Sequence, residues 1–255
     1  VKEVIALIKQ GKIIAIKGLG GFHLACDGNN ATAIATLRRR KNRPHKPLAL
    51  MVKDLEVAKV LCKINAKEIE LLKSGKAPIV LLDKHNPCPI PEEVAPQLNT
   101  LGIMLPYTPL HHLLFQKDIP ALVMTSGNMS SSPICYENTT ALKELKHAAD
   151  YFLIHNRDIN IPVEDSVVKV VDGKEAVMRR GRGYSPLAMP IGESDEILAL
   201  GAEEKGSFSL SQNSYGYMSQ YLGDLKNPQC LLTYQKALAN LKSLLCIEPK
   251  IIATD

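Results

Sequence analysis

The stretch Lys12-Ile-Ile-Ala-Ile-Lys-Gly-Leu-Gly-Gly21 joins an apolar, β-branched run to a cluster of three glycines. Such a run is typical of a buried strand, and the glycines after it indicate a tight turn. Residues 31–41, which follow, repeat their apolar side chains with the period of a helix. A strand, a glycine-rich turn and a helix in this order predict an α/β fold.

The same alternation continues on both sides of this unit. Helical spacing predicts an opening helix over residues 1–10 and further helices over 55–72 and 138–147. Apolar runs predict strands over residues 47–52, 77–82, 121–124, 151–154, 166–171 and 176–178. Because the last two strands are separated by little more than a turn, we expect a twisted sheet of mixed strand direction with flanking helices.

A change of composition divides the chain. Residues 179–190 are dense in arginine, glycine and proline, which marks a connection. We therefore expect one domain over residues 1–190 and the incomplete start of a second over residues 191–255. In the second domain, the sequence predicts strands over 197–201, 206–212, 216–219 and 250–253 and a helix over 233–245. An incomplete sheet has open edges, so we expect association or disorder in this part.

Composition limits the classes of function. The 255 residues carry a formal charge of +5, with 45% apolar and 22% charged side chains. These proportions are those of a globular protein with a buried core, and the charge is below that of a dedicated nucleic-acid-binding domain. No apolar run reaches the roughly 18 residues of a membrane span, and the first residues do not resemble a secretory signal. The six cysteines form no C-x-x-C pair, so we expect reduced thiols. Without a span or signal we expect a cytoplasmic protein, and the mild positive charge favours anionic substrates.

Basic residues gather before the predicted strand 47–52, in the run Arg38-Arg-Arg-Lys-Asn-Arg-Pro-His-Lys-Pro47. Cations are favoured at a helix C-terminus, so a solvated charged face is one explanation. The other explanation is ligand binding, because residues 41–46 leave the helix at the mouth of a sheet, where open α/β folds bind ligands. Lys41 and Arg43 suit phosphate oxygens.

A polar loop, Met124-Thr-Ser-Gly-Asn-Met129, follows the predicted strand 121–124. Ser126 and Asn128 are either turn and cap residues or neutral hydrogen-bond donors to a ligand that the cationic residues also bind. Spacing by itself leaves both explanations open. Two other candidates have simpler explanations: Cys26 as an inert core thiol, and His111-His112 as a pair without metal, since adjacent side chains diverge and no third ligand is near.

These residues also carry a resemblance. Lys41-x-Arg43 with Lys46-Pro47, and Ser126-x-Asn128, are similar to the lysine–arginine and serine–asparagine tetrad of the YrdC-like fold. Within that superfamily the chain resembles the HypF carbamoyltransferase family through Lys17-Gly-Leu-Gly-Gly-Phe-His-Leu-Ala-Cys-Asp27, Leu105-Pro-Tyr-Thr-Pro-Leu-His-His112, Glu164-Asp-Ser-Val167 and Arg179-Arg-Gly-Arg-Gly-Tyr184. Leu200-Gly-Ala-Glu203, Lys205 and Ser219-Gln-Tyr-Leu-Gly-Asp-Leu225 resemble the start of that family's last, actin-like (ASKHA-like) domain.

The resemblance implies a function. In the family, carbamate and ATP are joined to carbamoyl-adenylate with release of pyrophosphate, and ATP is used with Mg²⁺. Carbamate arises from carbamoyl phosphate in an acylphosphatase domain, and the carbamoyl group passes to the C-terminal cysteine of HypE for the cyanide ligands of [NiFe]-hydrogenase. This sequence contains neither that acylphosphatase domain nor the family's cysteine-rich zinc motifs. We therefore expect poor use of carbamoyl phosphate by this chain alone, and a homodimer is a further expected association.

The resemblance also implies roles for single residues. Lys41 and Arg43 are expected to be the catalytic pair, holding triphosphate and carbamate oxygens in a solvated cleft, where alanine substitutions would cost little stability. The residues expected to bind nucleotide or substrate are Lys17, His23, Lys46, Ser126, Asn128, Arg180 and Arg182, the last two unless they are simply solvated. Basic residues that usually precede the family's Asp-Asp-Ser-Val element are replaced here by Ile161-Pro-Val163, and its first acidic residue by Glu164.

Two other functions fit parts of the sequence. Threonylcarbamoyl-AMP synthesis, which serves transfer RNA modification, uses the same tetrad but does not account for an actin-like domain beginning at residues 200–203. A double-stranded RNA-binding module would need a broad basic surface. The excess charge is instead concentrated at residues 38–46 and 179–182, which favours a pocket.

Overall fold

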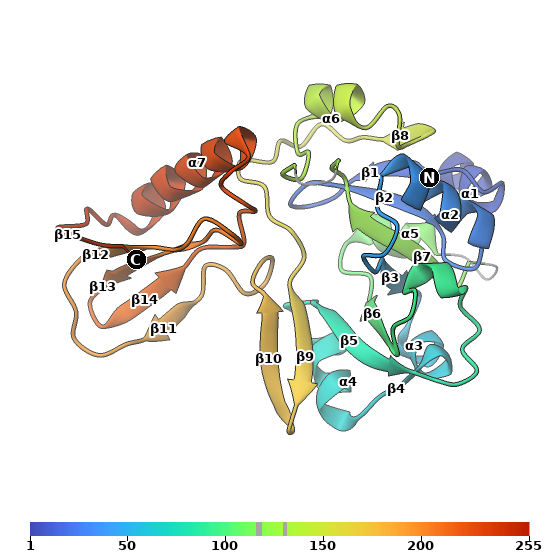
Figure 1. Cartoon of the computed structure of the whole chain (residues 1–255), viewed down its shortest axis with the longest axis horizontal. Coiled ribbons are helices and arrows are strands. Elements are labelled where there is room, and N and C mark those ends of the chain that lie inside the picture. The colour runs from blue at the N-terminus through green and yellow to red at the C-terminus, as the bar shows by residue number, and fades with distance from the viewer. Residues whose placement is uncertain (116–118, 130–131, 255) are drawn as a thin grey trace.

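The structure is a computed structural model that describes residues 1–115, 119–129 and 132–254. It has a large unit and a small unit, each built on its own sheet (Figure 1). The helices of the large unit are α1 (Lys2–Lys9), α2 (Ala31–Arg40), α3 (Leu55–Leu61), α4 (Ala66–Lys73), α5 (Pro109–Leu114) and α6 (Asn138–Glu144), with a short 3-10 helix, η1 (Glu92–Val94). Its strands are β1 (Ile14–Lys17), β2 (Phe22–Asp27), β3 (Ala49–Val52), β4 (Cys62–Lys63), β5 (Ile79–Lys84), β6 (Thr100–Met104), β7 (Ala121–Ser126), β8 (Tyr151–Leu153), β9 (Val167–Val171) and β10 (Lys174–Arg179).

The large sheet has the strand order β10-β9-β5-β6-β3-β7-β2-β1-β8, with β4 paired to β5. The pairs β1–β8, β3–β6 and β5–β9 are parallel and the other pairs are antiparallel. The predicted mixed α/β sheet with flanking helices is therefore confirmed. In its centre, β7 runs antiparallel to both neighbours, β2 and β3, so the C-terminal end of β7 lies beside their first residues. His23 pairs with Ser126 in this register, which places two predicted site residues next to each other.

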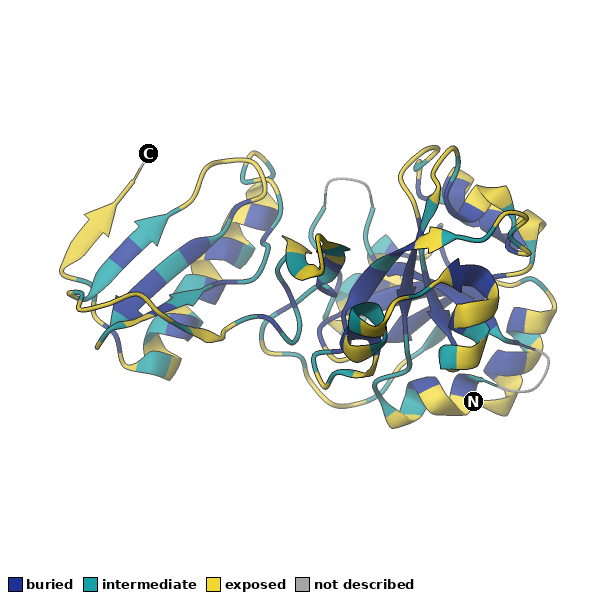
Figure 2. Cartoon of the chain, turned by 90° about the horizontal axis from the view of Figure 1, so that it is seen from below, coloured by how far each residue is buried: buried dark blue, intermediate teal, exposed yellow. Residues whose placement is uncertain are grey.

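Hydrophobic side chains are buried on both faces of the large sheet. On one face, Ile34 and Leu37 of α2 belong to the same cluster as Leu24 of β2. On the other face, Ile8 of α1 and Leu114 of α5 belong to a second cluster. The central strands are accordingly buried along almost their whole length (Figure 2). Strands covered on both sides consist of continuous apolar runs, which is why they could be predicted without any alternation of polar and apolar residues.

The small unit consists of β11 (Ala188–Pro190), β12 (Ile197–Leu200), β13 (Phe208–Gln212), β14 (Tyr215–Met218), β15 (Ile251–Ala253) and α7 (Pro228–Leu245). The strand order is β11-β14-β13-β12-β15, and α7 covers the sheet with Tyr234, Ala237 and Leu241. This part of the chain is folded rather than disordered, and β15 is exposed along its length at the edge of the sheet. The domain division at residue 190 stays a prediction, since β11 already pairs with β14.

Some elements differ from those that the sequence predicts. It does not predict β2, β6, α5 or β11, and β4 interrupts the helices predicted over residues 55–72. After β4, Asn65 starts a new helix through a reciprocal capping box with Glu68. In β2, the polar side chains of His23 and Asp27 interrupt the apolar pattern of a strand that is nevertheless buried. None of the helices in the described part of the chain has the length and hydropathy needed to cross a bilayer.

Candidate functional site

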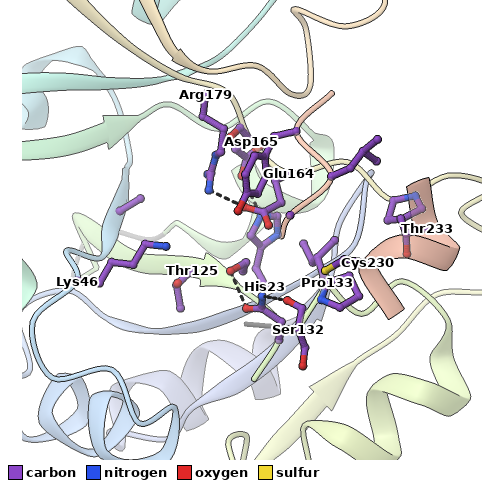
Figure 3. Close-up of a pocket in the computed structure, with 18 of the residues that line it drawn as sticks. His23, Lys46, Thr125, Ser132, Pro133, Glu164, Asp165, Arg179, Cys230 and Thr233 are labelled. Carbon is purple, nitrogen blue, oxygen red and sulfur yellow. Dashed lines mark hydrogen bonds and ion pairs between the residues drawn. The ribbon is translucent and has the colours of Figure 1, made fainter. Parts of the chain in front are cut away.

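A cavity of about 310 Å³ lies at the C-terminal end of β7 and has walls from both units. Its volume is near the lower end of the range of about 300–1,000 Å³ that is common for small-molecule sites. Six residues singled out from the sequence line it: His23, Lys41, Arg43, Lys46, Ser126 and Asn128. The other walls include Thr125, Ser132, Ile134, Glu164, Asp165 and Arg179 of the large unit and Tyr221, Leu222, Asp224, Cys230 and Thr233 of the small unit. Figure 3 shows Cys230 and Thr233 of the small unit beside Glu164, Asp165 and Arg179 of the large unit.

Lys41 joins two loops at this cavity, the cationic loop (residues 41–46) and the Ser/Asn loop (residues 126–129). It follows α2 directly, and its Nζ donates to the carbonyl oxygens of Ser126 at 2.5 Å and Asn128 at 2.7 Å. A third bond, of 3.1 Å, runs to Oδ1 of Asn128. Only 2% of Lys41 is exposed, so the expected solvated position is wrong. Its ammonium instead connects the ends of α2 and β7.

The Ser/Asn loop is also tied together by its own side chains. The hydroxyl of Ser126 donates to Oδ1 of Asn128 at 2.8 Å, and Nδ2 of Asn128 donates to the carbonyl oxygen of Ser132 at 2.6 Å. The turn explanation therefore describes the structure. The same side chains also line the cavity, and their contact with a ligand stays a prediction.

Arg43 and Lys46 bring positive charge to the cavity. Arg43 donates from Nη1 to Oγ1 of Thr125 at 3.2 Å and from Nη2 to the carbonyl oxygen of Pro47 at 2.8 Å. Burial, followed by the charge of Arg38, lowers the pKa of Arg43 to about 10. Partial burial and the charge of Arg43 also lower the pKa of Lys46, although its side chain stays largely exposed. Crowded cations of this kind favour a bound anion, since an opposite charge would offset their mutual repulsion.

A buried carboxylate organises the opposite wall. Oδ1 of Asp165 accepts hydrogen bonds from Nε and Nη2 of Arg182, at 3.0 and 2.8 Å, and from the hydroxyl of Tyr107 at 3.2 Å. Its Oδ2 lies 3.0 Å from Nε2 of His23. Burial raises the pKa of this carboxyl, but the bonds and charges of His23 and Arg182 outweigh it and hold the pKa well below its usual range. Asp165 therefore stays ionised and fixes the ring of His23 at the cavity.

Arg179 also lines the cavity, although the sequence does not single it out as a site residue. Its Nη1 donates to Oε2 of Glu164 at 2.6 Å, and its guanidinium lies 6.0 Å from the ring centre of Tyr221, a residue of the small unit (Figure 3 shows the pair with Glu164). Arg179 ends β10 and pairs with Val167 of β9 after a shift of register between Val177 and Arg179. The predicted strands 166–171 and 176–178 do not reveal this shift, so they give no signal that places Arg179 at the cavity.

Three residues expected to bind the ligand do not line this cavity. Lys17 is buried in β1 and its Nζ donates to the carbonyl oxygen of His155 at 3.4 Å. Arg180 donates to the carbonyl oxygen of Tyr184 at 2.9 Å. Arg182 is neither solvated nor turned to the cavity, because its guanidinium pairs with Asp165 and lies 3.5 Å from the ring centre of Tyr107. These side chains brace the backbone around the site.

The segment Ile161-Pro-Val163 packs against the glycine-rich turn. The amide of Val163 donates to the carbonyl oxygen of Gly20 at 2.9 Å, and a Cβ added to Gly20 would lie 2.2 Å from the carbonyl oxygen of Val163. Only glycine allows this approach. The segment therefore serves as a structural wall, with Pro162 lining the cavity.

The remaining candidates do not line the cavity. Burial raises the pKa of Cys26 to about 12, so its thiol stays protonated in the core. His111 is buried, and its ring lies edge-on to that of Tyr107, with 4.4 Å between the ring centres. Burial lowers the pKa of His111 to about 3. Among the residues that the structure describes, no three His, Cys, Asp or Glu side chains are grouped to hold a metal ion.

Comparison with known proteins assigns the large unit. The Sua5/YciO/YrdC family model, described as telomere recombination, matches residues 6–181, which is more than half of the chain. The chain belongs to the Sua5/YciO/YrdC family. A second family model, that of the HypF Kae1-like domain, matches residues 192–255.

Several known proteins are similar in sequence to nearly the whole of this chain. The carbamoyltransferase HypF of Synechocystis sp. is 44% identical over 97% of the chain, and HypF2 of Cupriavidus necator is 41% identical over 100%. The chain spans 33% and 34% of these two proteins, respectively. The resemblance to HypF is thereby confirmed.

Solved structures agree. Full-length HypF in a phosphate- and nucleotide-bound form has a TM-score of 0.96 and 42% identity, and the match covers all of this chain and 40% of that one. Sua5 of P. abyssi, complexed with L-threonine, has a TM-score of 0.64 and 15% identity, with 99% of this chain and 87% of that chain covered. The second likeness shows the fold alone, and both confirm the YrdC-like architecture.

Proposed function

We propose that this chain activates carbamate with ATP, forming carbamoyl-adenylate and pyrophosphate, as part of a carbamoyltransferase that serves hydrogenase maturation. The observation that supports this best is the convergence of the cationic loop and the Ser/Asn loop on one cavity. A HypF that is 42% identical was solved with phosphate and nucleotide bound, which fits a cavity of this charge.

The reaction requires mainly positioning and fixed positive charge. A carboxylate oxygen of carbamate attacks the α-phosphorus of ATP, a new phosphorus–oxygen bond forms, and the bond to pyrophosphate breaks with its electron pair on the leaving oxygen. Negative charge on the phosphate oxygens would be offset by Arg43, Lys46 and Arg179, which line the cavity. Lys41 adds charge and holds the Ser/Asn loop, which would hydrogen-bond the nucleotide. His23, fixed by Asp165, would contact the substrate.

Mg²⁺ would enter with the nucleotide. Proteins commonly hold a nucleotide's Mg²⁺ with one or two carboxylates, while the phosphates supply further oxygens. Glu164 and Asp224 line the cavity and fit such a role, although Glu164 is paired with Arg179. Mg²⁺ bound there would supply positive charge to the phosphates.

The carbamoyl acceptor in this proposal is the C-terminal cysteine of HypE, in the cytoplasm. Relatives named carbamoyltransferase HypF support transfer of a carbamoyl group, and the small unit matches the HypF Kae1-like domain. Double-stranded RNA binding is a weaker proposal, because the cations concentrate in a cavity with walls from both units. Homodimer formation stays a prediction.

Exchange of labelled pyrophosphate into ATP tests the function, because adenylate formation is reversible. We expect the purified chain to catalyse exchange when carbamate is present. Arg43→Ala is expected to be inactive, since it removes a cavity cation and its bond to Thr125. Bicarbonate with carbamoyl phosphate should support little exchange, and exchange seen only with threonine and bicarbonate would overturn the proposal in favour of threonylcarbamoyl-AMP synthesis.

The protein is expected to take up protons at Lys41 when it binds ATP slightly above neutral pH. Burial, then the charge of Arg43, lowers the pKa of Lys41 to about 7, so the free protein carries a partly deprotonated amine there. Bound phosphates raise this pKa, because an opposite charge favours the charged form. The contribution of the Lys41 charge to affinity is therefore complete below about pH 7 and is lost as the pH rises.

Calorimetry in buffers of different ionisation enthalpy measures this uptake. Lys41→Arg is the matched control, because arginine keeps its charge throughout this pH range. The same binding enthalpy in all buffers for the unaltered protein would contradict the prediction.

A further inference from the structure

Arg38 lies in the last turn of α2 and is turned inward, although its sequence neighbours are basic and the run is polar. Only 7% of it is exposed. Its Nη1 donates to the carbonyl oxygens of Arg43 at 2.8 Å, Pro44 at 3.1 Å and Lys46 at 3.1 Å. The guanidinium therefore holds three carbonyl groups of the cationic loop at once.

The same side chain ties this loop to a second segment. Nε of Arg38 donates to the carbonyl oxygen of Glu93 at 2.5 Å, and Nη2 donates to that of Val94 at 3.2 Å. Both acceptors belong to η1. All three guanidinium nitrogens are thus used, and the cationic loop is fixed against η1 as well as against α2.

This arrangement decides where the loop's side chains lie. Asn42 has a φ of 49°, which turns the chain sharply after α2 and which asparagine tolerates better than most residues. The carbonyl groups that follow it are gathered around Arg38, while the side chains of Arg43 and Lys46 line the cavity. The same backbone conformation therefore turns the carbonyl groups toward Arg38 and the cationic side chains toward the cavity.

We propose that Arg38 is a positioning residue for the phosphate-binding cations: its guanidinium holds the backbone of residues 43–46 so that Arg43 and Lys46 face the cavity. The inference rests on the proposed function for the identity of the ligand. Arg38 itself touches no ligand, since it does not line the cavity.

Arginine is the side chain suited to this task. Its planar guanidinium has five N–H donors in a fixed fork, whereas a lysine ammonium has three donors at one point. A lysine at position 38 would keep the charge but could not reach acceptors on both the cationic loop and η1. A simple requirement for positive charge at the helix C-terminus would be met by either residue.

The test compares Arg38→Lys and Arg38→Gln with Arg39→Gln, which removes a charge from the same helical turn at an exposed position. Calorimetry measures dissociation constants for ATP and for adenosine, which lacks phosphates. Both Arg38 variants are expected to bind ATP at least ~10-fold more weakly, because charged hydrogen bonds that fix the loop are lost, and to bind adenosine as before. Arg39→Gln should bind both like the unaltered protein.

Hydrogen exchange supplies a readout that does not depend on the ligand. The backbone amides of Asn42, Arg43, His45 and Lys46 are expected to exchange faster in both Arg38 variants, while those of β2 and β7 keep their rates. Unchanged exchange in the loop, or equal weakening for adenosine and ATP, would overturn the inference. So would loss of the fold in both variants, because Arg38 would then serve the core rather than the loop. If the unaltered protein binds no ATP, the proposed function fails. The hydrogen-exchange rates of the loop amides would still decide the role of Arg38.

Discussion

Replacement of Asp165 by asparagine is expected to lower the free energy of unfolding by about 3–5 kcal/mol, the usual cost of leaving a buried charge without its partner. Asp165 is 7% exposed and is the common acceptor for Arg182, Tyr107 and His23. An amide keeps the size of the carboxylate but removes the charge that compensates Arg182. It also introduces an NH₂ group where the neighbouring side chains offer mainly donors.

Urea unfolding measures this effect, with the exposed Asp158→Asn as the matched control. Because the pKa of Asp165 is depressed in the folded protein, its stabilising charge is fully present above the ordinary aspartate pKa of about 3.9. That contribution is lost only as the pH falls through the lower folded value. Asp165→Asn should therefore be equally destabilised at neutral and at mildly acidic pH, and a loss below about 1 kcal/mol would contradict the buried-pair interpretation.

Lys41→Met is expected to abolish pyrophosphate exchange but to change the free energy of unfolding by less than about 3 kcal/mol. A buried acceptor without a donor costs about 1–3 kcal/mol. That loss is opposed because methionine relieves the burial of a charge that lowers the pKa of Lys41. The substitution removes the donor shared by the carbonyl oxygens of Ser126 and Asn128 and by Oδ1 of Asn128. Methionine fills similar space, so the change in stability reports on the hydrogen bonds and the buried charge rather than on an empty cavity.

Unfolding curves and exchange assays on the same preparations separate the two effects. Lys46→Met is the control, because Lys46 is an exposed cation of the same loop. It should weaken ATP binding with almost no change in stability. If Lys41→Met kept near-normal exchange, Lys41 would only hold the Ser/Asn loop, and its assignment to the catalytic pair would be wrong.

Local patterns were enough to predict the fold class and much of the site. The β-branched run before Gly18 and the helical spacing after Asn30 depend on neighbouring residues, and β1 and α2 formed where they indicated. The sequence also identified the two loops that meet at the cavity, because cations after a helix and hydroxyl and amide groups after a strand are local signals too.

What could not be predicted depends on contacts between distant residues. His23 and Asp165 are 142 positions apart, and no periodicity links them. Arg38 and Arg39 look alike in sequence, yet one is turned toward η1 and the other toward solvent. For the same reason the sequence predicts a solvated loop position for Lys41 and a ligand contact for Arg182, and does not single out Arg179.

The shared walls of the cavity have a thermodynamic consequence. Tyr221 and Asp224 belong to the small unit, whereas Arg43 and Ser126 belong to the large one, and all four line the same space. A molecule that touches both walls binds more tightly when the units are docked, and linkage requires that it strengthen their docking by the same factor. The bound substrate would then stabilise the docked arrangement of the two units, and the rigidity of their junction would report how much of the cavity is occupied by substrate.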